Sequence, residues 1–376
     1  MPRIVYLATA DARGHLMRAQ LLVHGLRAAG AQVQVLTTSD AGQAFLQEFG
    51  IEAQILSHHY GVQFDAQQNM LRGATDSNVA HYVFRPTRML RDIARLHAVF
   101  RAADLVINDS FHPALLFMGA MPHWRRKVVH VYGASLRKAL SANFEGRIPR
   151  LLARAFAGIV GWQIDAALCR IEHDFAYDLV DATAQPSHIR LPTPVVVADG
   201  QANAAEAVAV YLNPHFRDVA LADALAAGLD HAGRHAHLVG EGYAGHGAWV
   251  GIDANWVSCA AQAPFIVSAP GMAALSIALV YRRPILLVLT DQPEQASNAA
   301  RAAQLGLRHE VVVWRGDAAA FSRDVASAAG RLMRAPGTLA ESDAGRAQAH
   351  ARIQAWVDCL LALGAGKTGH KAAAQP

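Results

Sequence analysis

The sequence predicts an α/β protein with two parallel sheets covered by helices. Three observations support this prediction. Apolar runs at residues 4–8 and 33–37 flank an amphipathic segment, which is the order strand, helix, strand. Residues 264–306 repeat that order, with a glycine turn before the first helix and a proline before the second strand. Between these units, residues 186–205 are rich in proline and small residues, as expected of a linker.

Length and composition fit a globular protein of ordinary size. The chain has 376 residues, enough for two domains with a sizeable core in each. Hydrophobic residues make up 53% and charged residues 17%, which excludes a disordered chain. No apolar run approaches the roughly 20 residues that cross a bilayer, and the start is typical of a strand rather than of a signal peptide. We therefore expect a soluble, cytoplasmic protein.

Cysteine usage and charge narrow the expected ligands. Cys169, Cys259 and Cys359 lie far apart without a Cys-x-x-Cys pair, which indicates a reducing compartment and no zinc site. The histidines between residues 58 and 112 lack the spacing of metal ligands, so we expect neither a metal nor a bound cofactor. The net charge of +4 suits an anionic substrate such as a nucleoside diphosphate, or an anionic membrane. The sequence shows no nucleic-acid-binding motif, so we expect no nucleic acid partner.

The first half opens with a strand, a short loop and a helix. We expect the loop over residues 9–15 and the helix over 16–29, with Gly30 as its C-terminal cap. Backbone N–H groups at such a helix start point at anions. Only Gly14 lies in the loop, so the Gly-x-Gly-x-x-Gly fingerprint is missing. That absence from the sequence argues against a nicotinamide-dependent oxidoreductase.

The rest of the first half supplies two more strands and two helices. Residues 88–102 predict a basic amphipathic helix, residues 104–109 a strand that ends in a carboxylate, and residues 128–132 a further strand. The polar segment 58–86 is expected to form loops over a substrate cleft. Residues 147–162 combine arginines with large apolar residues. That composition fits either a patch that docks on an anionic membrane or a helix with an apolar core face.

The second half repeats the alternation of strands and helices. We expect a strand over 207–212 followed by a loop at Asn213, and then helix 219–228, strand 235–239, the segment 264–306 and a last helix. The predicted domains are 1–185 and 206–345, joined by the linker 186–205. Helix 346–363 is expected to pack back on the first domain, and 364–376 to be a disordered tail.

Residues in the segment 264–306 keep the spacing of a known family. They are Gly271, Ser276, Ala278, Leu279, Pro284, Leu286, Glu294, Gln295, Asn298 and Ala299. The segment resembles the nucleotide-sugar-binding half of GT-B glycosyltransferases of the MurG and UDP-glucuronosyltransferase type, microbial enzymes with a Glu-Gln-x-x-Asn-Ala motif. The resemblance implies the GT-B fold, in which two Rossmann-like parallel-sheet domains face a cleft.

The resemblance also implies a donor-binding site. Gly271 would let the backbone approach a diphosphate, and the helix from Met272 would offer its N–H groups. Further donor-binding residues are expected in the surrounding loops: Gly14, Asn213, Ser268, Ser276, Asp291, Glu294, Gln295 and Asn298. For each of these residues, the alternative is that it only stabilises the conformation of its loop and binds no ligand.

One residue departs from the family pattern. Where the family has a glutamate that binds the ribose hydroxyls, this chain has Ile277, which accepts no hydrogen bond. Three interpretations follow from this departure. The ribose is held differently, the donor is unusual, or donor binding is lost.

Two residues of the first half match catalytic positions of the family. Gly14-His15 resembles the Gly-His pair whose histidine is the general base, and Asp109 matches the aspartate that orients it. The alternatives are that His15 caps the helix or contacts phosphate, and that Asp109 caps the helix beginning near Ala114. The two interpretations of Asp109 are compatible.

The predicted function is transfer of a sugar with inversion from a nucleoside diphosphate sugar, with UDP as the expected nucleotide, to an acceptor hydroxyl. The acceptor is a lipid, an aryl or polyketide compound, or a saccharide. No metal is expected, and contact with the inner face of the membrane fits a lipid acceptor. The alternatives are a non-catalytic GT-B protein that binds only a nucleotide or a partner, which Ile277 favours, and a GT-B nucleotide-sugar epimerase.

Overall fold

A computed structural model describes residues 1–8, 13–58, 86–109, 112–134, 150–179, 187–199, 207–290, 292–334 and 342–366. Of these residues, those up to Thr193 and those from Arg352 onward form one compact unit. Those from Pro194 to Ala351 form the other. Each unit has its own parallel sheet.

The first unit contains a seven-stranded sheet in the order β3-β2-β1-β4-β5-β6-β7, with all neighbouring strands parallel. Its elements are β1 (Arg3–Ala8), α1 (Arg13–Ala28), β2 (Gln32–Thr37), α2 (Asp40–Glu48), β3 (Ala53–Ile55), α4 (Pro86–Ala102), β4 (Leu105–Asp109), α5 (Pro113–Ala120), η1 (Arg125–Lys127), β5 (Val128–Gly133), α7 (Arg150–Ala166), β6 (Cys169–Asp174) and β7 (His188–Pro192).

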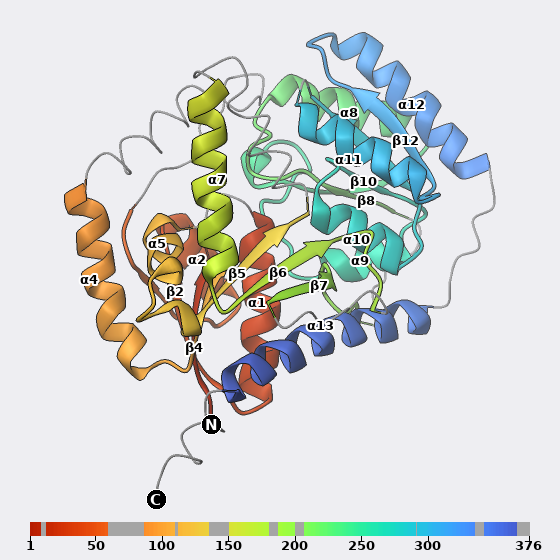
Figure 1. Cartoon of the computed structure of the whole chain (residues 1–376). Helices are drawn as coiled ribbons and strands as arrows, with labels where there is room; N and C mark the ends of the chain where they lie inside the picture. Colours follow the sequence, from red (N-terminus) through yellow and green to blue (C-terminus); the bar gives the residue numbers. More distant parts are fainter. Residues whose placement is uncertain are drawn as a thin grey trace, which may run out of the picture. The chain divides into compact units, whose positions relative to one another are not determined.

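Helices cover both faces of this sheet, which explains its continuous apolar strands. Helices α1 and α2 pack on one face, together with the end of α13 (Ser342–Ala365). Helices α4 and α5 pack on the other face, with α7 against α5 (Figure 1). Trp356 of α13 is fully buried, and its indole N–H donates to the Pro192 carbonyl oxygen at 2.8 Å. The last helix is therefore part of the first unit's core.

The second unit contains a five-stranded parallel sheet in the order β12-β11-β10-β8-β9. Its elements are β8 (Val208–Tyr211), α8 (Val219–His231), β9 (Ala236–Val239), η3 (Glu241–Tyr243), α9 (Trp256–Gln262), β10 (Ile266–Ser268), α10 (Met272–Val280), β11 (Ile285–Leu289), α11 (Pro293–Gln304), β12 (His309–Val313), α12 (Ala318–Arg334) and the first part of α13.

Helices α8 and α12 pack closely in the second unit (Figure 1). A Cβ atom on Gly228 of α8 would lie 2.7 Å from the backbone oxygen of Ser322 in α12, so the crossing requires glycine. Helix α9 contacts β8 through Trp256, whose indole N–H donates to the Val210 carbonyl oxygen at 3.0 Å. In the described part of the chain, no helix has the length and apolar character needed to cross a bilayer.

The structure corrects two boundaries. Helix α1 begins at Arg13, so Gly14 and His15 lie in its first turn and not in a loop. Strand β7 (His188–Pro192) occupies part of the predicted linker, because its backbone pairs with β6 as an edge strand. The tail residues from 367 onward lie outside the described residues.

Candidate functional site

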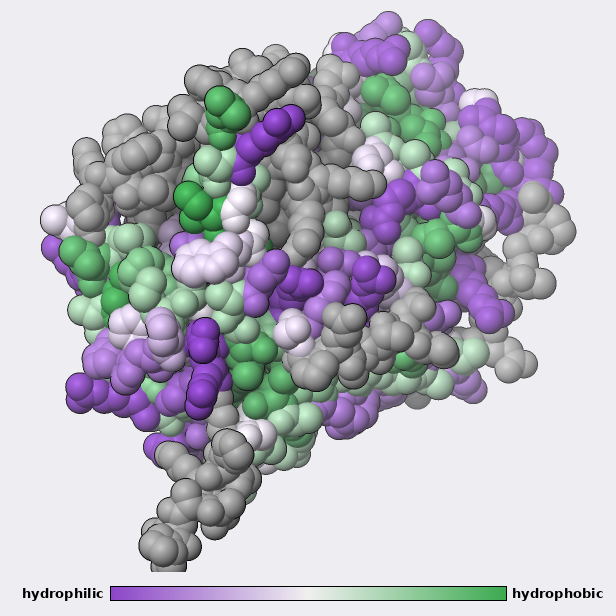
Figure 2. Space-filling model, in the orientation of Figure 1, coloured by the Kyte–Doolittle hydropathy of each residue, from purple (hydrophilic) through white to green (hydrophobic). Residues whose placement is uncertain are grey.

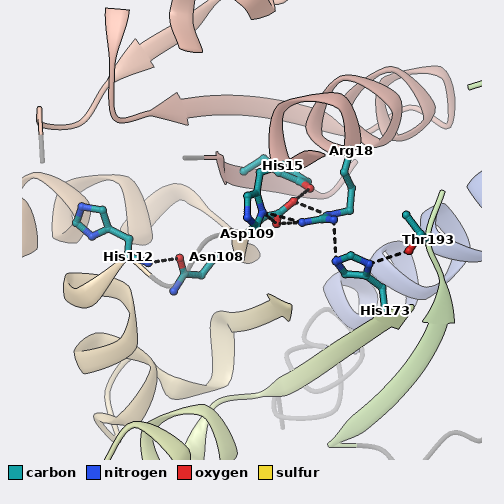
Figure 3. A network of polar contacts seen from close by, with 8 residues as sticks. His15, Arg18, Asn108, Asp109, His112, His173 and Thr193 are labelled. Atoms are coloured by element: carbon teal, nitrogen blue, oxygen red, sulfur yellow. Dashed lines mark hydrogen bonds and ion pairs between the residues drawn. The ribbon is translucent and has the colours of Figure 1, made fainter. Parts of the chain in front are cut away.

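A buried polar network lies at the carboxyl ends of the first unit's strands (Figure 3). Its centre is Asp109, the last residue of β4, which has no exposed surface. Strand β1 lies beside β4, with Ala8 paired to Asp109, and the Tyr6 hydroxyl donates to Asp109 Oδ2 at 2.6 Å. In open parallel sheets this edge is where ligands bind. The network therefore occupies the edge at which a substrate site is expected.

His15 reaches Asp109 from the first turn of α1. Its Nδ1 lies 2.9 Å from Asp109 Oδ1, and the His15 side chain is 30% exposed. The structure therefore brings together the two residues that the sequence assigned to catalysis. The contact also shows that Asp109 bonds to the imidazole, whereas α5 begins at Pro113 without a side-chain cap.

Arg18 is a member of this network that sequence reasoning missed. It lies one turn after His15 on α1, is 4% exposed, and holds Asp109 with two bonds. Arg18 Nε donates to Asp109 Oδ2 at 2.8 Å, and an Nη2 hydrogen bonds to Asp109 Oδ1. The signal was available, because Arg18 is the one charged residue among the buried positions of α1. A lone charge on the buried face of a helix needs a partner.

A second histidine, His173, also forms a hydrogen bond with Arg18. Arg18 Nη1 lies 2.7 Å from His173 Nε2, and His173 Nδ1 lies 3.0 Å from Thr193 Oγ1. Because arginine only donates, His173 Nε2 is the acceptor and its Nδ1–H donates to the threonine hydroxyl. His173 lies on β6 and Thr193 directly follows β7, so three strands and the residue after a fourth contribute to one network. Neither residue is part of a motif that the sequence shows.

Charge keeps Asp109 ionised. Burial alone would raise the pKa of the Asp109 carboxyl, but the Arg18 guanidinium, followed by the His15 hydrogen bond, holds it well below its usual range. Burial, reinforced by the Asp109 charge, raises the pKa of the Tyr6 hydroxyl far above its ordinary value. Burial and then the Arg18 charge lower the pKa of His173, which stays neutral. The network is thus a carboxylate held by one buried cation.

Asp109 and Arg18 both contact Nδ1 of His15. A carboxylate only accepts hydrogen bonds, so Asp109 favours a proton on Nδ1, whereas Arg18 Nη2, which only donates, lies 2.8 Å from the same nitrogen and favours the other tautomer. With the proton on Nδ1, the Arg18 Nη2 hydrogens are directed to Asp109 instead. In that tautomer His15 Nε2 has a free lone pair. This is the arrangement in which an imidazole accepts a proton from a substrate.

Asn108 extends the polar cluster behind β4 to two more histidines. Its Oδ1 accepts from the backbone N–H of His112 (Figure 3). Its Nδ2 donates to His130 Nδ1 at 3.1 Å. Burial lowers the pKa of His112 and of His130 to about 3 each. His112 Nε2 lies 3.8 Å from Asp92, whose negative charge would favour the protonated imidazole. His130 is therefore the better residue for testing the effect of burial on stability.

Folding stability is therefore expected to fall in mild acid. In the unfolded chain a histidine has a pKa near 6.5. Between pH 6.5 and about 3, His130 is therefore protonated in the unfolded chain but neutral in the folded protein. The contribution of neutral His130 to the free energy of unfolding is fully present above pH 6.5. It declines as the pH falls toward 3, by on the order of a few kcal/mol in total. Urea unfolding at stepped pH measures it.

The matched variants are His130→Gln and His24→Gln. Glutamine keeps an acceptor for Asn108 but does not titrate, so the first variant should flatten the stability profile between pH 6.5 and 3. His24 is exposed on α1, and its replacement should leave the slope unchanged. An equal slope in His130→Gln and the wild type would contradict the assignment.

The predicted donor-binding turn lies in the second unit, after β10. Gly271 is exposed and is the N-terminal cap residue of α10, and Met272 is the first helical residue. A Cβ atom on Gly271 would meet no atom closer than 4.0 Å, and its φ of −82° suits any residue. The glycine thus leaves open space over the first N–H groups of α10. An anion can approach such a helix start closely.

Several of the residues predicted to bind the nucleotide sugar instead form hydrogen bonds with the chain around this turn. Ser276 is fully buried, and its hydroxyl donates to the Met272 carbonyl oxygen at 2.7 Å. Gln295 Oε1 accepts from the Thr290 backbone N–H at 2.7 Å, which ties α11 to the loop after β11. Asn298 Nδ2 donates to the Pro270 carbonyl oxygen at 2.9 Å and so holds the turn before α10. These side chains position the backbone around the turn.

The remaining predicted donor residues fall into three groups. Ser268 is buried at the end of β10, and Asn213 closes a turn after β8 by accepting from the His215 N–H at 3.0 Å. Gly14 lies in the first unit, in the first turn of α1. Asp291 and the side chain of Glu294 lie outside the described residues.

Ile277 is 7% exposed in the middle of α10. Its aliphatic side chain is packed rather than presented to solvent. It therefore provides apolar packing at the position where the family has a ribose-binding carboxylate.

Helix α7 carries apolar side chains on both its faces. Val160 and Ile164 are buried against Leu116 and Tyr132. Leu151, Ile159 and Trp162 are 79%, 55% and 57% exposed. Figure 2 shows the apolar atoms of this helix beside a hydrophilic strip. The helix thus has the core face and also the exposed apolar face that the sequence allowed.

Solved structures of glycosyltransferases superpose on nearly the whole chain. The glycotransferase of kitacinnamycin superposes with a TM-score of 0.65 at 16% identity, over 96% of this chain and 99% of that one. LpCGTa in complex with UDP gives 0.59 at 15% identity, over 96% and 99%. The glycosyltransferase VinC in complex with dTDP gives 0.58 at 17% identity, over 96% and 99%.

The chain has the GT-B fold. This conclusion rests on the full-length superposition and on the two parallel sheets. No protein-family model matches the chain. No curated protein matches its sequence.

Proposed function

We propose that this GT-B protein is a glycosyltransferase that moves a sugar from a nucleoside diphosphate sugar to an acceptor hydroxyl with inversion. The observation that carries the proposal is the 2.9 Å contact between His15 Nδ1 and Asp109 Oδ1 at the carboxyl edge of the first sheet. In the tautomer with the proton on Nδ1, the lone pair of Nε2 is free, as a general base requires. The GT-B neighbours support sugar transfer as the chemistry.

In the proposed reaction, His15 Nε2 takes the proton of the acceptor hydroxyl as its oxygen attacks the anomeric carbon. Asp109 holds the imidazole and stabilises the imidazolium that forms. The bond from the anomeric carbon to the diphosphate oxygen breaks on the opposite face of the sugar, which inverts the configuration. Backbone N–H groups at the start of α10 stabilise the leaving diphosphate, so this step needs no metal.

The donor is proposed to carry a pyrimidine nucleotide. LpCGTa and VinC were solved with UDP and dTDP, which supports that class among the nucleoside diphosphates. The sugar is proposed to be a hexose, as in the MurG and UDP-glucuronosyltransferase type. The buried Ile277 fits a donor whose ribose is held by backbone groups.

The acceptor is proposed to be a small molecule with a free hydroxyl. The kitacinnamycin enzyme among the neighbours supports an aryl or polyketide compound over a saccharide. A lipid acceptor is the variant that the exposed apolar side chains of α7 support, and it would place the enzyme on the cytoplasmic face of the membrane.

A non-catalytic GT-B protein is the second candidate, because Ile277 removes a carboxylate from the donor site. A non-catalytic protein that binds a partner alone differs from the transferase in nucleotide binding. Calorimetric titration with UDP, dTDP, GDP and ADP tests them. The transferase requires saturable binding of at least one diphosphate, whereas a partner-binding protein without a donor site binds none of them.

Substitution of Gly271 locates that binding. We expect Gly271→Trp to abolish diphosphate binding and to leave the unfolding midpoint unchanged, since the position is exposed and sterically open. The control is Gly330→Trp on α12, where a Cβ atom would meet only the end of Arg334 at 3.9 Å. Undiminished binding in Gly271→Trp would remove the start of α10 from the donor site.

A further inference from the structure

Three potential metal ligands converge in the second unit, outside the proposed transfer site. His237 is the second residue of β9, Asp253 lies in the following segment, and Cys259 lies in α9. One ligand atom from each lies within 4.8 Å of the others. We propose that His237, Asp253 and Cys259 bind a divalent transition metal of the zinc class.

The backbone explains how residues far apart in the sequence meet. After β9 the chain turns back, and Val250 exchanges backbone hydrogen bonds with Leu238 and Gly240 at 3.0 and 2.9 Å. This return places Asp253 beside the edge strand, and His237 Nε2 lies 2.6 Å from Asp253 Oδ2. Helix α9 begins three residues after Asp253, at Trp256, and brings Cys259 to the pair. The convergence is fixed by main-chain bonds.

The carboxylate of Asp253 is oriented for this role. Its Oδ1 accepts from the Asn255 backbone N–H at 2.8 Å, and its backbone oxygen accepts from the Trp256 N–H at 3.2 Å. One carboxylate oxygen is therefore anchored, while Oδ2 faces the imidazole. Anchoring of ligand groups by surrounding hydrogen bonds is typical of metal sites.

The chemical types of the three ligand atoms favour particular metal ions. A thiolate and an imidazole suit Zn²⁺ and its neighbours in the transition series, whereas Mg²⁺ and Ca²⁺ prefer oxygen ligands only. Tetrahedral bonds of about 2.0 Å to N and O and 2.3 Å to S separate ligand atoms by roughly 3.3–3.6 Å. Small side-chain rotations therefore convert the present cluster into three ligands.

Binding involves a simple proton balance and leaves a coordination position open. The Cys259 thiol loses its proton to solvent, and His237 keeps one proton on the nitrogen that does not bind. Exposed fractions of 32% for the His237 side chain and 22% for that of Asp253 let the ion enter from solvent, and water supplies the fourth ligand.

The site is expected to stabilise the fold rather than to take part in sugar transfer. His237 pairs with Ala209 near the start of β8, whereas the proposed donor turn follows the carboxyl end of β10. A bound ion would link β9, the returning segment and α9. The inference does not depend on the proposed function.

Titration of the metal-depleted full-length protein with Co²⁺ tests the site. We expect saturation at one equivalent, with the visible bands of tetrahedral Co²⁺ and a thiolate-to-cobalt charge-transfer band. Zn²⁺ should displace the bands and raise the unfolding midpoint. Absence of saturable binding at one equivalent would overturn the proposal.

Variants assign the ligands. Cys259→Ser should abolish the charge-transfer band, and Asp253→Asn, which keeps an oxygen for the Asn255 N–H, should weaken Co²⁺ binding at least tenfold. Cys359→Ser on α13 is the thiol control and should bind Co²⁺ like the wild type. A charge-transfer band that survives Cys259→Ser, or disappears in Cys359→Ser, would refute this ligand set.

Discussion

Replacing His15 by glutamine is expected to lower acceptor-dependent turnover by about 10²–10⁴-fold, the usual contribution of a general base. The glutamine amide can still donate to Asp109 but has no nitrogen lone pair for the acceptor proton. His15 is partly exposed in the first turn of α1, so folding should survive the change. Steady-state release of nucleoside diphosphate measures the effect, which should fall on kcat rather than on the donor KM.

The matched control is His24→Gln. His24 lies on the same helix, is exposed, and has its Nε2 3.0 Å from the Phe49 carbonyl oxygen. Its replacement should leave turnover unchanged. A His15→Gln enzyme that retained more than a tenth of wild-type turnover would show that His15 is not the base.

Replacing Arg18 by methionine is expected to destabilise the first unit by about 3–5 kcal/mol, because it leaves the Asp109 carboxylate buried without its cation. Tyr6 and His15 would remain as hydrogen-bond partners, but the permanently charged guanidinium would be gone. Hydrogen exchange of peptides from β1 and β4 in increasing urea measures this loss within the first unit.

A double-mutant cycle separates the lost charge pair from lost packing. Adding Asp109→Asn to Arg18→Met removes the stranded charge, so the two changes should be non-additive by about 1–3 kcal/mol. Arg27→Met is the helix control, since Arg27 is exposed and donates to the Val33 carbonyl oxygen. Additive losses, or a loss in Arg18→Met no larger than in Arg27→Met, would contradict the central role of this ion pair.

The fold was accessible from the sequence because its signals are local. Apolar strands, amphipathic helices and glycine or proline breaks mark most elements of both sheets in the order observed. Strands β3, β6, β7 and β12 were missed, and the residues of β7, between prolines, have the composition of a linker. The pairing of β7 with β6 is a long-range interaction that composition does not encode.

The candidate site was only partly accessible. His15 and Asp109 could be named because each sits in a recognisable local pattern, and the structure places them in contact. Arg18, His173 and Thr193 come from three segments whose proximity depends on the whole sheet. The hydroxyl of Ser276 was predicted to bind a donor, yet it is taken up by the preceding turn of its own helix, a bond that serine commonly makes there.

The most direct test is an NMR time course of the purified protein with UDP- and dTDP-sugars and a panel of hydroxylated aryl and polyketide acceptors. We predict that free nucleoside diphosphate and a new glycoside appear in equal amounts, only when acceptor is present, with the anomeric coupling of the inverted sugar. The same signals should be lost in His15→Gln. Retained configuration, or epimerised sugar nucleotide without acceptor, would contradict the mechanism.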